Sequence, residues 1–561
     1  MKTKAADQHS NSEDRTSIAA AYDTIVVGGG MAGLTATAYL ARAGQKVILI
    51  EKNKDLGGLV NSFSRNGFHF DAGVRAFEDA GIIFPMLQDL GIELEVVKSP
   101  VSVGIEHEIL NVVDINSLAE YGDLLKRLYP ESDAEIDQLL KIIRQIMKQM
   151  DVLYGIENPL FKDLKRDKSF LFKKLLPWLP RFLTTIGKIN RMQGPVEDFL
   201  EAVIQDPSLR DVVSQHFFER TPAFFALSYF SLYLDYFYPR GGVGKLADAM
   251  QEKILQLGGQ IKTETVITVV SPAEHTVSDS SGTYYKYRNL IWAADLKTLY
   301  RITKVHNLPA LVKTRFEEVK ADMLKHRGGD SVLTLFLQID EPPESFGRIT
   351  NGHFFYTPSR QGLGETHRRD LQAMLSRFPA IGKGEVLAWL ERFISLNTFE
   401  ISIPVLKDKD LAPVGKTGLI ISLLAKYELF EKVQEAGWVE EFVAECQQRI
   451  ISVISESVFP MLKDKVIDGF MTTPLGIHNR IGSSEGAIVG WEFQAKMPVI
   501  NRIQIADRAV LTPLPSVYQA GQWVFSPAGV PMSILTGKLA ANKVIASQTK
   551  NRRLQRRIKR H

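Results

Sequence analysis

The segment from residue 22 to 58 constrains the fold of this chain more than any other. Gly28, Gly30 and Gly33 follow one apolar run in the spacing G-x-G-x-x-G and precede a helix-like segment, and a second apolar run ends at Glu51. This succession of strand, glycine turn, helix and strand is the βαβ fingerprint of a dinucleotide-binding domain. We therefore predict an α/β fold with a Rossmann-type domain at this position.

Each residue of the fingerprint has a physical role in holding a dinucleotide. Gly28 permits the tight turn, and Gly30 lets the backbone come close to a pyrophosphate. Gly33 lets the helix pack closely on the strand, and the helix N-terminus offers N–H groups and the positive end of its dipole to the phosphates. Glu51 follows Gly28 by 23 residues, where a carboxylate can accept a hydrogen bond from a ribose hydroxyl.

A second pair of glycines indicates which dinucleotide is bound. Gly57 and Gly58 come shortly after Glu51. A dehydrogenase that uses NAD does not need them, whereas many flavoproteins of the two-dinucleotide-binding type have a second glycine turn that brings the backbone to the FAD pyrophosphate. We therefore predict FAD as the cofactor.

Composition limits the remaining function classes. A chain of 561 residues exceeds one ordinary core, so we expect two or more domains. A net charge of +4 is too small to indicate a nucleic-acid partner. The single cysteine, Cys446, excludes an intramolecular disulfide framework and fits a cytoplasmic protein, and no metal-ligand spacing predicts a metal site. Residues 1–21 lack the apolar core of a secretory signal and are expected to form a disordered leader.

The sequence is compatible both with contact to a membrane surface and with none. No stretch predicts a membrane span, which needs about 20 mainly apolar residues. Residues 161–188 interleave apolar side chains with lysine and arginine, as an interfacial helix does, although a surface helix pair on the core has the same pattern. The basic tail 549–561 is typical of a solvated end, although anionic lipid would attract it. Peripheral membrane contact is therefore one alternative, and the oligomeric state is not indicated.

Residues 217–238 are unusually aromatic. Phenylalanine and tyrosine recur through the segment, from Phe217 to Tyr238. One interpretation is a buried core element. The other is the wall of an apolar substrate pocket, because sites for lipophilic ligands are lined mainly by aromatic and aliphatic groups. The pattern alone leaves both open.

A second glycine-rich turn imitates the fingerprint. Gly242, Gly244 and Ala247 have a relaxed G-x-G-x-x-A spacing. The turn follows proline and arginine rather than a buried strand, so we do not predict a second dinucleotide site. Lys245 is followed by leucine, which excludes a Walker loop. We expect a turn that opens a helix.

Five further motifs occur in order along the chain. They are FHFDAG (68–73), YPRGGVGKLADAM (238–250), IWAAD (291–295), TPLGIHNRIGSSEGAIVGWE (473–492) and AGQWVFSPAGVPMSILTGKLAA (520–541). Together with the N-terminal fingerprint, this order resembles the flavin amine oxidase superfamily and, within it, the branch of phytoene desaturases, carotenoid isomerases and retinol saturases.

The pattern of strands and helices predicts a chain that returns to the nucleotide-binding domain twice. We expect a discontinuous FAD-binding domain from residues 22–100, 236–300 and 501–548. A mixed α+β substrate domain is expected from residues 101–235 and 301–500.

Carried over position by position, the resemblance implies a set of cofactor contacts. The glycines would hold the phosphates, Glu51 the adenosine ribose, and Val266 the region of the adenine. The helix that begins at residue 530 would direct its N-terminus at the flavin, where negative charge accumulates on reduction. The full set is Gly28, Gly30, Gly33, Glu51, Lys52, Gly57, Gly58, Leu59, Val266, Gly521, Val530, Pro531 and Met532.

The resemblance also implies a reaction. FAD would exchange hydride with a lipophilic polyene such as a carotenoid or retinoid, in desaturation, saturation or cis–trans isomerisation of carbon–carbon bonds. The alternative is an amine oxidase-like enzyme that oxidises a C–N bond, and a third hypothesis is a flavin- or lipid-binding protein without catalysis. Glu492 and Arg480 are the candidate catalytic residues, although ion pairs or helix ends use the same residue types. Leu59 and Val74 stand where the family usually has arginine and proline.

Overall fold

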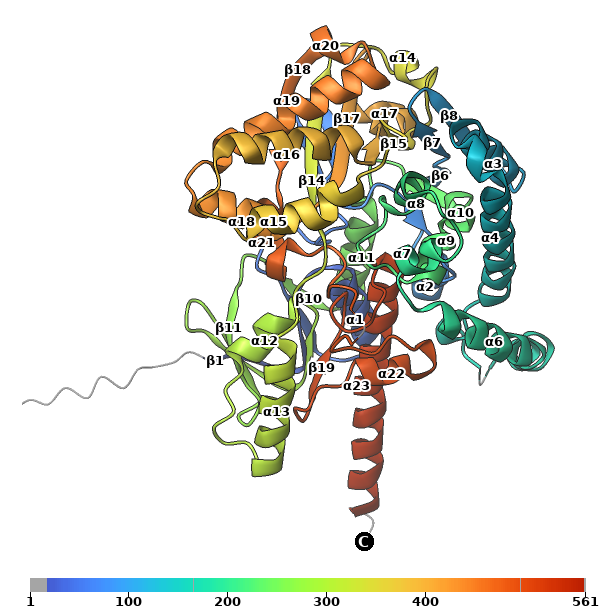
Figure 1. The fold of residues 1–561 in the computed structure, drawn as a ribbon. Helices are drawn as coiled ribbons and strands as arrows, with labels where there is room; N and C mark the ends of the chain where they lie inside the picture. The colour runs from blue at the N-terminus through green and yellow to red at the C-terminus, as the bar shows by residue number, and fades with distance from the viewer. Residues whose placement is uncertain (1–17, 165, 495, 559–561) are drawn as a thin grey trace, which may run out of the picture.

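The computed structural model describes residues 18–164, 166–494 and 496–558. Two lobes, each built on one large sheet, lie one above the other in Figure 1, and a layer of helices flanks them on one side. We call them the lower lobe, which contains the fingerprint, and the upper lobe. This mixed architecture confirms the predicted α/β class.

The lower sheet is mostly parallel at its centre. Its strand order is β10-β2-β1-β13-β12-β11, with β19 paired to β13. β1 pairs in parallel with β2 and β13, and all four residues of β2 are buried, as expected for a parallel sheet covered on both faces. The strands are β1 (Ile18–Val27), β2 (Val47–Ile50), β10 (Gln260–Lys262), β11 (Ile267–Ser271), β12 (Thr276–Asp279), β13 (Tyr284–Trp292) and β19 (Val517–Gln519).

The first strand begins earlier than the sequence indicated. Residues 18–21, which we assigned to a disordered leader, belong to β1. The reason is the long partner strand β13, whose residues from Tyr284 onward supply pairing positions for Ile18, Ala20 and Ala21. The rest of that predicted leader, residues 1–17, lies outside the described residues.

One face of the lower sheet and its glycine turns are covered by α1 (Met31–Arg42), α11 (Lys245–Gln256) and α23 (Val530–Ile558), and the other face by α12 (Leu296–Ile302) and α13 (Ala310–Met323). α1 and α23 contact each other closely, because a Cβ on Gly537 would lie only 2.3 Å from the carbonyl oxygen of Ala32. Pro531 and the residues up to 545 predict a helix that opens with proline in its first turn, and α23 begins at Val530 and continues to Ile558, projecting from the lower lobe in Figure 1.

The upper sheet has the order β18-β14-β17-β16-β15-β7-β8. Helices α16 (Lys383–Leu396) and α19 (Val439–Ser457) pack on one of its faces. On the other face, Phe336 and Ile420 contact Phe68 and Phe70, so this face is turned toward the lower lobe. Phe68 and Phe70 belong to a small hairpin of β3 (Ser62–Arg65) and β4 (Phe68–Asp71). The strands of the upper sheet are β7 (Val101–Ile105), β8 (Glu108–Val112), β14 (Ser331–Ile339), β15 (His353–Thr357), β16 (Phe399–Ser402), β17 (Thr417–Ala425) and β18 (Val466–Thr472).

The flanking layer of helices comes from residues 117–233, between β2 and β10 of the lower sheet. Apolar residues recur at helical spacing from 115 to 150, which predicts a helical stretch, and the structure has two helices there, separated by a short 3₁₀ turn at Pro130. None of the described helices is both long and apolar enough to cross a bilayer. The main helices of this layer are α3 (Ser117–Leu128), α4 (Asp133–Leu153), α6 (Leu176–Ile189), α7 (Val196–Glu201), α8 (Pro207–Ser214), α9 (Ala223–Leu227) and α10 (Tyr229–Tyr233).

Candidate functional site

The fingerprint turn forms between the end of β1 and the start of α1. Gly28 has a φ of +106°, and a Cβ on it would lie 2.7 Å from the carbonyl oxygen of Ala293. A Cβ on Gly33 would lie 1.9 Å from the Gly28 carbonyl oxygen, so only glycine allows the helix to start here. No described atom lies within 4 Å of a Cβ built on Gly30. Its backbone therefore faces open space that a ligand can fill.

Glu51 closes one side of this turn. Its Oε2 accepts a hydrogen bond from the Gly29 N–H at 2.6 Å, and its Oε1 accepts one from the Asn53 N–H at 2.9 Å. The carboxylate is thereby fixed at the end of β2. Because a carboxylate can accept more than two hydrogen bonds, capacity remains for a ribose hydroxyl.

The second pair of glycines lies against the first. The Gly57 N–H donates to the Gly29 carbonyl at 2.8 Å, and Gly30 and Gly57 form an isolated parallel bridge. Gly57 has a φ of +101°, and a Cβ on it would lie 2.1 Å from the Val60 carbonyl oxygen. The first turn, at Gly28 to Gly30, and the second turn, at Gly57 and Gly58, thus form one continuous backbone surface.

The C-terminal part of the chain supplies the opposite wall. Gly521 has a φ of +103°, and its N–H donates to Thr536 Oγ1 at 3.0 Å. Gly529, Val530 and Ser533 bring the N-terminus of α23 to the same cavity. A second helix N-terminus therefore adds positive potential where phosphate or reduced flavin would carry negative charge.

These segments enclose a cavity of about 200 Å³. Its glycine surfaces, two helix N-termini and one carboxylate are the groups that a dinucleotide needs, so the residues present fit FAD. Eight of the predicted contacts line it: Gly28, Gly30, Glu51, Gly57, Gly58, Leu59, Gly521 and Val530. When bound, FAD supplies hydride transfer.

The other predicted cofactor residues do not line this cavity. Gly33 lies beneath the turn, and Met532 packs against the hydrophobic core. Lys52 points toward the upper lobe, where its Nζ donates to the Asn479 carbonyl at 3.3 Å. Val266 is 44% exposed, and Pro531 follows the lining residue Val530 in the first turn of α23.

The two predicted catalytic residues, Glu492 and Arg480, belong to the motif 473–492 near the cofactor cavity. Glu492 accepts a hydrogen bond from Gln494 Nε2 at 2.8 Å, and its N–H donates to the Arg327 carbonyl. Arg480 lies near the end of α21 (Pro474–Ile481), where its carbonyl accepts a hydrogen bond from Asn53 Nδ2 at 3.0 Å. Neither side chain lines the cofactor cavity.

Sequence reasoning missed several residues of the cofactor cavity. Asp295, Ser483 and Gln522 line it, and each lies inside one of the motifs that we quoted. Asp295 Oδ2 accepts from the Ser484 N–H at 2.8 Å, which ties two of these motifs together. The signal in the sequence was that each of these three residues lies in a quoted motif, because their spacing by itself predicts no particular chemistry.

The glycine turn that imitates the fingerprint has a structural role. Its N–H groups are occupied, because Val243 donates to Asp71 Oδ1 at 3.0 Å and Gly244 donates to Ser62 Oγ at 2.9 Å. Tyr238 also donates to Asp71, at 2.7 Å. The turn therefore joins α11 to the β3–β4 hairpin and offers these N–H groups to no phosphate.

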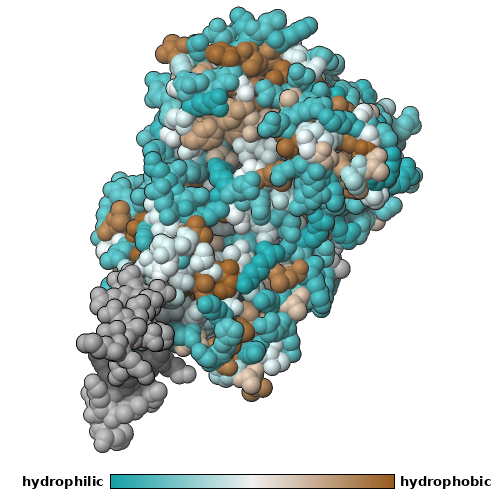
Figure 2. Space-filling view, turned by 90° about the vertical axis from the view of Figure 1, so that its left-hand side faces the viewer, coloured by the Kyte–Doolittle hydropathy of each residue, from teal (hydrophilic) through white to brown (hydrophobic). Residues whose placement is uncertain are grey.

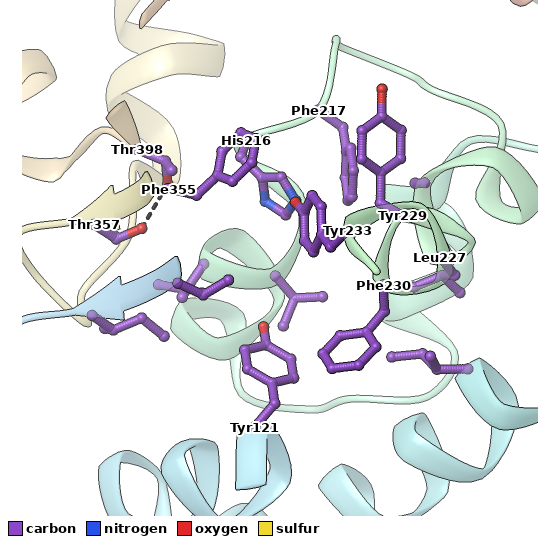
Figure 3. A pocket seen from close by; sticks show the side chains of 16 residues that line it. Tyr121, His216, Phe217, Leu227, Tyr229, Phe230, Tyr233, Phe355, Thr357 and Thr398 are labelled. Atoms are coloured by element: carbon purple, nitrogen blue, oxygen red, sulfur yellow. Dashed lines mark hydrogen bonds between the residues drawn. The ribbon is translucent and has the colours of Figure 1, made fainter. Parts of the chain in front are cut away.

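A second, apolar cavity lies in the helical layer next to the upper sheet, as Figure 3 shows. It encloses about 60 Å³. Part of the aromatic segment lines it, which favours the interpretation of that segment as a pocket wall. The aromatic lining residues are Tyr121, His216, Phe217, Tyr229, Phe230, Tyr233 and Phe355.

The aromatic cavity carries no charge. Burial lowers the pKa of His216 to about 4, so its imidazole is neutral, and burial raises the pKa of Tyr121 to about 12. The hydroxyls of Thr357 and Thr398 pair with each other at 2.7 Å (Figure 3). The cavity is therefore suited to an uncharged, apolar ligand.

Five polar side chains, of which Arg75, His353 and Ser422 are buried, lie close together. We call Arg75, His353, Glu400, Lys407 and Ser422 the polar cluster. Arg75 follows Val74, a residue of the cofactor cavity, and its Nη2 donates to Ser422 Oγ at 3.0 Å. His353 Nε2 lies 3.1 Å from Glu400 Oε1. Burial lowers the pKa of Lys407 to about 8, and the pKa of Glu400 is lowered by His353, Arg75 and Lys407 against the opposing effect of burial.

The fold and the glycine-lined cavity define an FAD-dependent oxidoreductase. Comparison with known proteins specifies it further. The family model described as flavin containing amine oxidoreductase matches residues 31–374. The chain belongs to this family.

Two kinds of relative extend over nearly the whole chain. The all-trans-retinol 13,14-reductase of Danio rerio is 23% identical, over 94% of this chain and 86% of its own. The chloroplastic prolycopene isomerase of Daucus carota is also 23% identical, over 94% of this chain and 80% of its own. Both names agree with the branch that the motif order indicated.

Solved structures confirm the architecture. Putrescine oxidase, in a structure with bound putrescine, superimposes with a TM-score of 0.56 at 15% identity, covering 94% of this chain and 99% of that one. At this identity the likeness concerns the fold alone.

Proposed function

We propose that this protein uses FAD to change carbon–carbon double bonds of a lipophilic polyene, by saturation, desaturation or isomerisation. The observation that carries the proposal is the uncharged aromatic cavity between the helical layer and the upper sheet. The whole-length similarity to a retinol reductase and a prolycopene isomerase supports it. Aromatic side chains hold a polyene by apolar burial and stacking.

The cofactor contacts belong to the same proposal. We propose that the glycine turns at Gly28 and Gly57 hold the FAD phosphates and that Glu51 accepts from the ribose. The N-terminus of α23 would face the flavin ring. Support comes from the clashes that a side chain on Gly28 or Gly57 would cause and from the fixed carboxylate of Glu51.

The aromatic cavity must widen to hold such a ligand. Its volume of about 60 Å³ admits only part of a polyene. Side-chain movement on binding is common even where the backbone is rigid. We expect Phe217 and Tyr229, which meet edge to face at 5.1 Å between centroids, to separate.

An amine oxidase reaction has less support. Trp523 lines the cofactor cavity, but it meets Trp491 edge to face at 83° rather than forming a parallel aromatic pair. The likeness to putrescine oxidase is one of fold. No observation at the site therefore favours oxidation of a C–N bond.

The decisive experiment is a substrate panel with the purified holoprotein. Retinoids, carotenoids and other polyene lipids would be incubated with the flavin either oxidised or reduced, and the polyene absorption spectrum recorded. We expect a spectral change for at least one polyene. Peroxide release with amines and unchanged polyene spectra would instead establish the amine oxidase alternative.

We further propose that the protein contacts membranes peripherally through α6. An apolar stripe runs at helical spacing from Phe172, in the π-helical turn Leu171–Leu175 just before α6, through Leu176, Leu179 and Leu183 of α6. These four side chains are 61%, 47%, 39% and 54% exposed. The opposite side of α6 is anchored, because Trp178 Nε1 donates to the Val152 carbonyl at 2.6 Å.

The position and charge of α6 support this proposal. It projects from the side of the molecule in Figure 1, turned away from the face in Figure 2, where hydrophobic residues form only separate small patches. Lys173, Lys174, Arg181 and Lys188 accompany the apolar stripe, which suits the headgroups of anionic lipid.

Vesicle co-sedimentation tests the membrane proposal. We expect binding to vesicles that contain phosphatidylserine and a marked loss when the four apolar residues of the stripe become serine. Leu311→Ser with Val414→Ser is the matched control, since these side chains are 87% and 103% exposed elsewhere. Equal effects of both sets of substitutions would contradict a role for α6.

A further inference from the structure

A buried lysine lies directly behind the cofactor cavity. Lys297 belongs to the first turn of α12 and follows Asp295, which lines that cavity, by two residues. Only 3% of its side chain is exposed. Burying an ammonium group costs free energy unless it is paired and hydrogen-bonded. The partner is Glu485, whose two carboxylate oxygens accept from Lys297 Nζ at 2.7 and 2.9 Å.

Glu485 lies in a turn that forms one wall of the cofactor cavity. Ser483 and Ile488, on either side of it, line the cavity. Glu485 has a φ of +51°, in the left-handed region that residues other than glycine seldom adopt. Such a conformation persists only where the surroundings hold it in place. The hydrogen bonds from Lys297, together with one that the Gly328 N–H donates to Glu485 Oε2 at 2.7 Å, provide that support.

Lys297 is also connected to the wall on the C-terminal side of the cavity. Its Nζ lies 5.7 Å from the ring centroid of Trp491, a cation–π contact. Trp491 Nε1 donates to the Trp523 carbonyl at 2.8 Å, and Trp523 lines the cofactor cavity. One ammonium group thus connects three segments that contribute lining residues: 293–295, 481–488 and 520–523.

We propose that Lys297 is a positioning residue for the cofactor: paired with Glu485, it fixes the turn at 483–488 and thereby sets how tightly the protein retains FAD. This inference rests on the proposed cofactor contacts. Neither side chain lines the cavity, so the pair acts through the wall rather than by touching the cofactor. Binding to a wall that is already ordered avoids the entropy cost of ordering it at each binding event.

The test measures the rate at which the purified holoprotein releases FAD. Holoprotein would be diluted, and the free FAD that passes an ultrafiltration membrane would be recorded over time, while circular dichroism shows that each variant stays folded. We expect Lys297→Met to release FAD at least about tenfold faster than the wild type, the equivalent of one lost hydrogen bond between charged groups. A side chain that only supported the fold would not change this rate in the folded protein.

Three further variants test whether the charge pair is responsible. Glu485→Gln should also accelerate release. The double variant with Lys297→Met should release FAD no faster than the faster single variant, because two side chains that act as one unit have non-additive effects. Lys297→Arg, whose guanidinium can bind both oxygens of Glu485, should release FAD more slowly than Lys297→Met. Lys543→Met is the matched control, since Lys543 pairs with Asp507 at 2.7 Å at the surface, away from the cavity.

The outcomes separate this inference from the proposed cofactor contacts. If the wild type itself retains no FAD, the proposed contacts are wrong. If the wild type retains FAD and Lys297→Met releases it equally slowly, the positioning role is wrong while the contacts stand. Equal acceleration by the control, additive effects in the double variant, or equal release from the arginine and methionine variants would also overturn it. Should Lys297→Met fail to fold, Glu485→Gln, which keeps the shape of the side chain, provides the same comparison.

Discussion

Gly33 and Gly384 both lie in the first turn of a helix, but only Gly33 meets neighbouring backbone. A Cβ on Gly33 would lie 1.9 Å from the Gly28 carbonyl oxygen, whereas no described atom lies within 4 Å of one on Gly384. We expect Gly33→Ala to purify with little bound FAD and Gly384→Ala with a normal content. The ratio of flavin to protein absorbance measures this. Full FAD content in Gly33→Ala would show that the turn can relax.

A carboxyl near the aromatic segment makes stability depend on pH. Burial raises the pKa of Glu78 to about 7 from an ordinary 4.5, on β5 (Phe77–Glu78) opposite Tyr236. The folded protein holds this proton more tightly than the unfolded chain, so this contribution to stability is present at low pH and is lost as pH rises through about 7.

Glu78→Gln should remove that dependence. Between pH 5 and pH 8 we expect the wild type to lose up to about 3 kcal/mol of unfolding free energy relative to the variant. Urea midpoints of the two proteins at both pH values provide the measurement. Parallel pH profiles would mean that Glu78 stays solvated.

At the scale of elements, one side chain joins a hairpin, a strand and a helix turn. Asp71 of β4 accepts from Ser62 Oγ, the Val243 N–H and the Tyr238 hydroxyl. Asp71→Ala leaves these donors unpaired, and we expect a loss of about 3 kcal/mol or more. Differential scanning calorimetry would show the fall in Tm, with Asp340→Ala at a 62% exposed side chain as the control. Similar melting of both variants would contradict this role.

At the scale of the whole molecule, the proposed FAD cavity brings distant parts of the chain together. The cavity combines Gly28 to Val60, Ala293 to Asp295 and Ala520 to Ser533. A ligand that binds only the folded state stabilises it by about 2.7 kcal/mol at a hundred times its Kd. We therefore expect FAD removal to lower the Tm and FAD addition to restore it, as thermal unfolding would show. An unchanged Tm would mean that the lobes are stable without the cofactor.

Elements with a strong local pattern could be predicted from the sequence, and their spatial relations could not. The mainly apolar residues from Ser331 to Ile339 predict a strand, and β14 has these bounds. The stretch from 115 to 150 became two helices because Pro130 interrupts the hydrogen-bond ladder. β1 begins at Ile18 because β13 is long enough to pair with it there. The local sequence around Ile18 gives no information about the length of that partner strand.

The two parts of the candidate site differ in the same way. The cofactor cavity has a sequence signal, because close backbone approach demands glycine at fixed spacing. The polar cluster has none: Arg75, His353, Glu400 and Lys407 come from separate segments that only the upper sheet and the hairpin bring together. The motif 473–492 therefore indicates Glu492 as a candidate catalytic residue, whereas Glu400 lies in none of the quoted motifs.

The close contact between α1 and α23 also has a consequence for biosynthesis. A nascent chain that has emerged only as far as residue 500 contains the complete fingerprint but lacks the wall from Ala520 to Ser533. Because domains fold as their segments leave the ribosome, such a chain can form the first glycine turn without retaining a dinucleotide. Stalled ribosomes that expose 500 residues should therefore carry no flavin, and capture of the cofactor is a late event in the life of each molecule.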